Sequence, residues 1–140
     1  MYTLEEIAAL RQKCIELQLD GREILEKYSD IGLQTICNGI GPEGAGVFLR
    51  RFLNKLHPAI EPAAMIHDVE FFESDGSEEK FTAANDRFVK NGCKGAFLYP
   101  WYDFRRYIVS FQAHRLGAFC RHFGTFSWQL GALRAGKRSV

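Results

Sequence analysis

The stretch AAMIHDVEFF, Ala63 to Phe72, decides the fold, because it sets two adjacent ionisable residues within a run of small and apolar ones. Pro62 precedes the run and suits the first turn of a helix. In such a helix His67 and Asp68 point about 100° apart, onto neighbouring faces. His67 is suited to proton transfer near neutral pH, and Asp68 to holding a metal. The stretch predicts a core helix that carries a candidate site.

A second amphipathic segment, at about residues 78–90, has a polar residue in its apolar stripe. Asn85 lies between Phe81 and Phe88 at helical spacing, and a buried amide without a hydrogen bond costs on the order of 1–3 kcal/mol. An antiparallel neighbour that carries His67 would supply the partner, with the Asn85 oxygen accepting from an imidazole N–H. Sequence alone does not separate a structural bridge from a positioning role.

Helical spacing dominates the rest of the chain, whereas strand signals are weak. Thr3 with Glu6 forms a capping box, and Asp86 is expected to be solvated and paired with Lys90 four residues on. The fold class is all-α, one domain over 1–140 with an antiparallel helix pair after a glycine-rich loop. The expected helices cover about 4–17, 20–28 with an extension towards 33, 47–56, 63–72, 78–90 ended by Asn91-Gly92, 101–123 and 126–133, with a loose basic tail over 134–140.

The beginning of the sequence and its hydropathy predict a soluble cytoplasmic protein. The first residues, MYTLEEIAALRQK, are acidic and amphipathic, unlike a signal peptide. No run reaches the roughly 18 apolar residues of a membrane span. Export by a non-classical or phage route stays open.

Four cysteines are spread widely along the chain, without the short spacing of a zinc or redox motif. We expect free thiols, and two disulfides only if the protein meets an oxidising space. They are Cys14, Cys37, Cys93 and Cys120.

Charge is uneven along the chain, with a net −6 over residues 1–92 and +7 over residues 93–140. This asymmetry indicates either an anionic partner, such as a membrane surface, or two parts that complement each other within one fold. The basic helix expected at 101–123 is read as a central core helix with arginines at its edges, in preference to a helix on a membrane surface. Nucleic acid is the least favoured partner, because no recognised DNA-binding motif accompanies the charge.

The stretch NGIGPEGAG, over residues 38–46, breaks the helical pattern. Glycine allows backbone conformations that turn carbonyl oxygens inward, as Gly39 and Gly41 could do for calcium. One carboxylate and one such loop make an incomplete site, which water or substrate oxygens would have to complete. A plain connection between helices is an equally open reading.

Together, CNGIGP, then HDVEF beginning 26 residues after Gly41, then ANDRF resemble the phospholipase A2 superfamily in its disulfide-free viral and bacterial form. The resemblance covers about residues 36–91. It implies that His67 is the general base, taking a proton from the water that attacks the sn-2 ester of a phospholipid. It also implies that Asn85 occupies the position of the Asp that orients this histidine.

The same resemblance implies a calcium site. Asp68 would bind the ion together with main-chain carbonyls of Cys37, Gly39 and Gly41. The calcium would stabilise the oxyanion as a Lewis acid. On this reading the protein is a carboxylic ester hydrolase of lipid degradation that acts on phospholipid or at a membrane surface.

The sequence departs from the family pattern at three of these positions. Asn85 carries no charge, Phe71 replaces a tyrosine, and Pro42 removes an N–H after Gly41. About ten extra residues also separate the loop from the His-Asp helix. The alternative function is therefore a non-catalytic structural or binding protein, related to phages or mobile elements, that keeps the helical scaffold.

Overall fold

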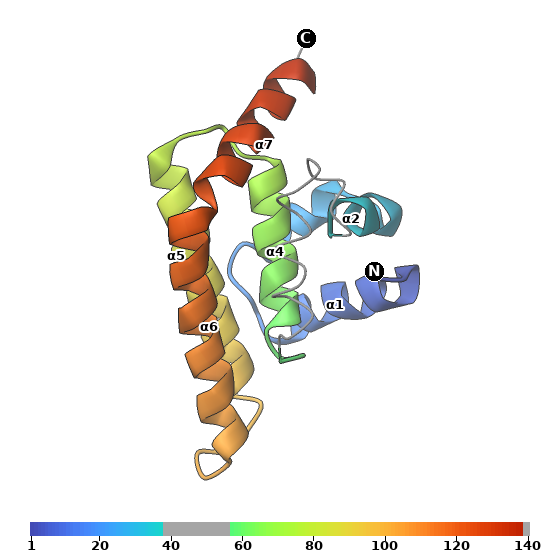
Figure 1. Cartoon of the computed structure of the whole chain (residues 1–140). Helices are drawn as coiled ribbons and strands as arrows, with labels where there is room; N and C mark the ends of the chain where they lie inside the picture. The colour runs from blue at the N-terminus through green and yellow to red at the C-terminus, as the bar shows by residue number, and fades with distance from the viewer. Residues whose placement is uncertain (38–56, 139–140) are drawn as a thin grey trace.

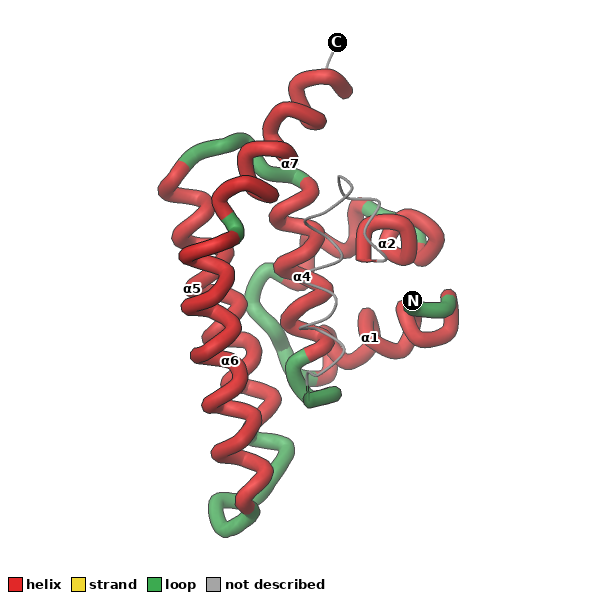
Figure 2. Tube along the Cα trace, in the orientation of Figure 1, coloured by secondary structure: helices red, strands yellow, loops and turns green. Residues whose placement is uncertain are grey.

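The computed structural model describes residues 1–37 and 57–138. Within these ranges every regular element is a helix (Figure 2), which confirms the all-α class. The glycine-rich loop and the helix expected at 47–56 lie outside the described residues. In chain order the elements are α1 (Leu4–Glu16), the 3-10 helix η1 (Arg22–Lys27), α2 (Asp30–Cys37), α4 (Glu61–Phe72), α5 (Glu78–Ala96), α6 (Phe104–Phe123) and α7 (Thr125–Arg138).

Helix α4 is the centre of the molecule, with α5 and α6 along one side and the N-terminal elements on the other (Figure 1). It contacts α1, η1, α2, α5 and α7. Its residues from Pro62 to His67 are all buried, as is Val69. Pro62 lies in the first turn, as predicted. Neighbouring elements cover almost every face of α4, which explains why its apolar residues are not confined to one side of the helix.

Helices α5 and α6 form a long antiparallel hairpin that reaches beyond the end of α4 (Figure 1). Small residues let the two backbones approach closely. A Cβ added at Gly92 would come within 2.8 Å of the Ala113 Cβ, and one added at Gly117 would overlap the Val89 side chain. The antiparallel α4–α5 pair predicted from sequence is therefore part of a larger layer that includes α6.

The predicted end of α5 at Asn91-Gly92 is wrong, because the helix continues to Ala96. The Asn91 side chain is used for a tertiary contact instead. Its oxygen accepts from the Asp20 backbone N–H at 2.9 Å, and its nitrogen donates to the Asp20 carbonyl at 2.8 Å. An Asn-Gly pair that signals a helix end locally is held inside the helix by this distant partner.

The predicted start of the second helix at Asp20 is also wrong. Gly21, with φ of 80°, precedes η1, and the chain turns extended at Tyr28 before α2 begins. The Asp20 carboxylate pairs with Lys90 at 2.6 Å and with Lys94 at 3.0 Å. These pairs join the N-terminal segment to α5.

The expected Asp86–Lys90 pair does not form, since Lys90 binds Asp20. Asp86 is exposed, as predicted, and pairs with Arg121 of α6. This contact joins the acidic and the basic parts of the sequence, as does that between Asp20 and Lys94.

The C-terminal elements differ from expectation at their ends. Helix α6 begins at Phe104, after Asp103 caps it by accepting from the Arg105 backbone N–H at 3.0 Å. Helix α7 runs to Arg138, so the loose tail predicted from residue 134 is wrong for residues 134–138. The expectation that α6 is a central core helix is wrong as well, because α6 buries one face and exposes the other.

Two further expectations concern the whole chain. The thiols of Cys14, Cys37, Cys93 and Cys120 are free, as predicted. Over residues 1–37 and 57–138, none of the helices combines the length and the apolar character needed to cross a membrane.

Candidate functional site

His67 on α4 and Asn85 on α5 face each other across the helix pair. The distance from His67 Nε2 to Asn85 Oδ1 is 2.9 Å, and the two residues are 4% and 0% exposed. This confirms the predicted contact. Asn85 Nδ2 donates to the Phe81 carbonyl, one turn earlier on the same helix, at 3.0 Å. The amide is thereby oriented with its oxygen towards the imidazole.

This arrangement fixes the proton on the ring. A carbonyl oxygen only accepts, so His67 Nε2 must donate and the neutral ring carries its lone pair on Nδ1. Burial lowers the pKa of His67 to about 4, and the hydrogen bond to Asn85 opposes this shift only in part. The imidazole is therefore neutral at pH 7 and can accept a proton at Nδ1.

Aromatic side chains enclose the imidazole. The centre of its ring lies 4.2 Å from that of Phe71 and 5.1 Å from that of Phe88. Phe71 packs in turn against Trp128 of α7, whose indole N–H donates to the Ser77 carbonyl at 2.9 Å. Phe71 thus supplies packing where a tyrosine would add a hydroxyl. These apolar surroundings explain why burial dominates the pKa of His67.

Asp68 is half-buried and acts electrostatically on groups from three other parts of the chain. Burial is the main reason why the pKa values of Tyr2, Cys37 and Cys120 are raised, and the Asp68 carboxylate raises each of them further. For Cys120 the resulting pKa is about 12. The fold therefore brings Asp68 near the last residue of α2, directly before the glycine-rich loop.

Of the predicted calcium ligands, the structure describes Asp68 and Cys37. The raised pKa keeps the Cys37 thiol protonated, so the atom of Cys37 that could bind a cation would be its main-chain carbonyl oxygen. Carbonyls at a helix C-terminus carry partial negative charge and favour cations. Gly39 and Gly41 lie outside the described residues. Within the described ranges, no group of three His, Cys, Asp or Glu side chains could hold a metal.

Sequence reasoning missed Tyr2, whose phenol lies near both Asp68 and Glu61. The Tyr2 carbonyl accepts from Gln34 Nε2 of α2 at 3.0 Å, which fixes this residue beside the site. A tyrosine just before the first helix gives no local signal of such a contact, because its partners are distant in the sequence.

The remaining histidines lie apart from this pair. His57 precedes α4, and its Nε2 lies 3.3 Å from the Tyr99 hydroxyl. His114 of α6 is exposed and lies 3.7 Å from the Cys93 sulfur. His67 alone among the histidines combines deep burial with a polar partner fixed by its own helix.

Comparison of the chain with protein-family models, with curated proteins and with solved structures found no match. The function is therefore inferred from the chemistry of the site.

Proposed function

We propose that the protein is a phospholipase A2-like enzyme that hydrolyses a phospholipid ester in the presence of calcium. The observation that carries the proposal is the 2.9 Å contact between His67 Nε2 and Asn85 Oδ1, which leaves a neutral imidazole with an unprotonated Nδ1. A general base needs this protonation state at its operating pH. The resemblance of the His-Asp helix, the glycine loop and the Asn85 helix to that superfamily supplies the substrate class.

In this mechanism His67 Nδ1 accepts a proton from the water that attacks the ester carbonyl. Asn85 holds the ring in place through Nε2, with its own amide fixed by the Phe81 carbonyl. An uncharged amide stabilises an imidazolium less well than a carboxylate does, so we expect a slow enzyme.

Asp68 would hold calcium together with main-chain carbonyls of Cys37, Gly39 and Gly41. Bound there, the ion would supply Lewis-acid stabilisation of the charge that develops on the ester oxygen.

The second candidate function is a non-catalytic scaffold that binds another molecule or serves a structural purpose. The enclosure of His67 favours it, because a ring that is 4% exposed and packed by Phe71 and Phe88 leaves little room for a substrate. On this reading the contact between His67 and Asn85 satisfies two polar side chains within the core.

Hydrolysis of phospholipid vesicles distinguishes the two candidates. We expect the wild-type protein to release fatty acid with calcium and not with a chelator. His67→Gln, which can still donate to Asn85, should reduce the rate at least about 100-fold, because a general base typically contributes 10²–10⁴-fold. Asn85→Asp should raise the rate at least about 10-fold by restoring a charge beside the imidazolium.

Asp86→Asn is the matched control, since Asp86 is the next residue of the same helix and is exposed. Its rate should equal that of the wild type. Absence of fatty-acid release by both the wild type and Asn85→Asp, with no calcium binding by calorimetry, would support the scaffold instead. Circular dichroism of each variant checks that the fold is kept.

A further inference from the structure

Helix α6 is apolar on two opposite sides. Val109, Ala113 and Leu116 face the rest of the molecule and are at most 6% exposed. At about 100° per residue, the side opposite to these carries a second stripe. A large exposed apolar stripe on a folded protein ordinarily marks a surface that another molecule covers. The members of this stripe are Phe104, Tyr107, Ile108 and Phe111, which are 74%, 58%, 36% and 61% exposed.

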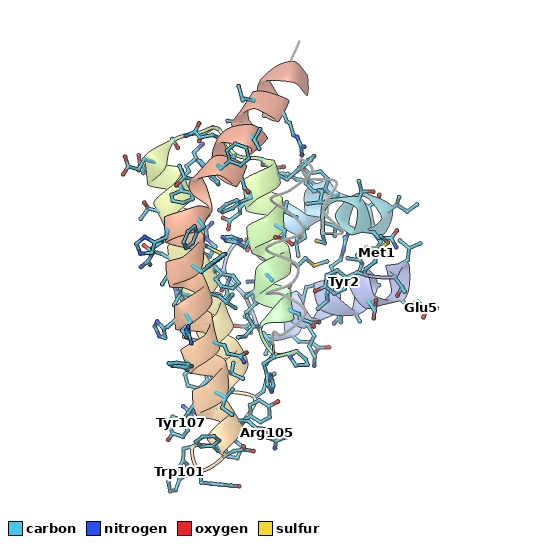
Figure 3. The ribbon with its side chains drawn as sticks, in the orientation of Figure 1. Met1, Tyr2, Glu5, Trp101, Arg105 and Tyr107 are labelled. Atoms are coloured by element: carbon cyan, nitrogen blue, oxygen red, sulfur yellow. The ribbon has the colours of Figure 1, made fainter. Side chains whose placement is uncertain are left out.

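The stripe continues into the turn that closes the hairpin. Here we define the hairpin tip as residues 97–111. Figure 3 places Trp101, Arg105 and Tyr107 together at the free end of the hairpin, away from α4. Four further large side chains of the tip are exposed by about half or more, namely Phe97, Leu98, Trp101 and Tyr102.

Arginines lie among these rings. Arg105 lies over Tyr99, with 4.5 Å from its guanidinium carbon to the ring centre, and Arg106 lies over Phe97 at 4.7 Å. The acid in the tip is Asp103, which pairs with Arg105 at 2.7 Å. The tip is therefore aromatic with a net charge of +1, and Arg106, which lies over the exposed Phe97 ring, is its cation without an acidic partner in the tip.

We propose that the hairpin tip docks on an anionic lipid bilayer. Trp, Tyr and Phe side chains favour the boundary between headgroups and acyl chains, and nearby arginines bind lipid phosphates. The net charge of +7 over residues 93–140 favours an anionic surface over a second copy, and a nucleic-acid duplex would leave the apolar rings uncovered. This inference goes beyond ester hydrolysis and holds whether or not His67 is catalytic.

Fluorescence of the whole chain tests the proposal, because its two tryptophans differ. Trp101 of the tip is 73% exposed, whereas Trp128 beside the candidate site is 3% exposed. The probes are vesicles of phosphatidylcholine alone or mixed with phosphatidylserine, both with brominated acyl chains. Ether-linked lipids and a calcium chelator prevent hydrolysis, so failure of the enzyme proposal leaves this test unaffected.

We expect the mixed vesicles to quench the tryptophan emission and to bind at least about 10-fold more protein than the neutral vesicles. Trp101→Phe should abolish the quenching, since Trp128 stays out of reach of the bromines. Raising the salt concentration should weaken the binding, as screening of exposed charges requires.

Arg105→Glu combined with Arg106→Glu should reduce binding to the mixed vesicles at least about 10-fold. Lys80→Glu is the matched control, because Lys80 is exposed on α5 near the end of the hairpin opposite to the tip. It should bind as the wild type does. Equal binding by the charge-reversed variant, or no quenching of Trp101, would overturn the proposal. So would a dimer in sedimentation that Phe111→Ser dissociates, because the second stripe would then belong to an interface between copies.

Discussion

Burial makes the proton affinity of His67 a property of the fold. The imidazole lies among aromatic rings and donates its one N–H to an amide, so a second proton would place an uncompensated charge in the core. Its pKa of about 4 compares with 6.5 for an ordinary histidine. Within the folded protein the ring is neutral over the whole physiological range.

The same shift predicts how stability depends on pH. Between pH 6.5 and 4 the unfolded chain binds a proton at His67 and the folded chain does not, so the free energy of unfolding falls as the pH is lowered through this window. The full loss is about 3 kcal/mol, since one pKa unit corresponds to about 1.4 kcal/mol. Urea unfolding at several pH values measures it.

His67→Gln is the reference for that measurement, because it removes the titrating ring and keeps a donor for Asn85. Carboxylates titrate alike in both proteins. The difference between the two plots of unfolding free energy against pH therefore measures the contribution of His67 alone. If the unfolding free energies of the two proteins changed in parallel from pH 7 to 4, the assignment of a neutral buried histidine would be contradicted.

At the level of elements, the α5–α6 contact depends on residues without side-chain bulk. A Cβ at Gly117 would overlap Val89 Cγ2, and a β-branched side chain has few alternative rotamers with which to move away. The two helices therefore pack closely along this line.

Gly117→Ala should therefore destabilise the protein by about 1–3 kcal/mol, the usual cost of overpacking. Adding Val89→Ala should recover part of this loss, because the removed methyl groups make room for the new one. Gly32→Ala in α2 is the control, since its Cβ would have ordinary contacts of 3.6 Å. Thermal unfolding measures all of these variants. Additive effects of Gly117→Ala and Val89→Ala would contradict the close contact.

Local patterns predicted the centre of each element better than its ends. The capping box of Thr3 and Glu6 formed as predicted, because all of its partners lie within one turn. Asn91 signals a helix end locally, but its bonds to Asp20, 71 residues away, outweigh that preference. The exposed stripe of α6 was misread for a related reason, since hydropathy alone does not reveal which of two apolar faces the fold covers.

At the level of the whole molecule, the N-terminal elements are tied to the hairpin through few polar contacts. Asn91, 1% exposed, receives and donates a hydrogen bond at the Asp20 backbone. Lys94 adds a bond to the Gln18 carbonyl at 2.7 Å. The turn after α1 is thereby held against α5.

Asn91→Ala should lower the free energy of unfolding by about 2–3 kcal/mol, because it leaves a backbone N–H and a carbonyl without their partner. Lys90→Ala removes only an exposed ion pair with the same Asp20 and should change stability by less than about 1 kcal/mol. Chemical denaturation compares the two. Similar effects of both variants would show that the amide contact carries no special weight.

Only part of the candidate site could be predicted from the sequence. The contact of His67 with Asn85 was predictable, because a polar side chain in an apolar helical stripe requires a hydrogen-bond partner and each could supply one for the other. The position of Tyr2 near Asp68 was not, because it depends on how α1 and α2 pack against α4 over more than 60 residues of sequence. The predicted calcium ligands Gly39 and Gly41 lie outside the described residues, so their role stays a prediction.

The central position of α4 also implies an order of assembly. The α5–α6 hairpin joins neighbours in the chain, so little loop-closure entropy opposes its formation. Contacts between α1 and α4 enclose a far longer stretch of polypeptide. Because short turns also join α4 to α5, we expect α4, α5 and α6 to associate first and the N-terminal helices to pack against them afterwards.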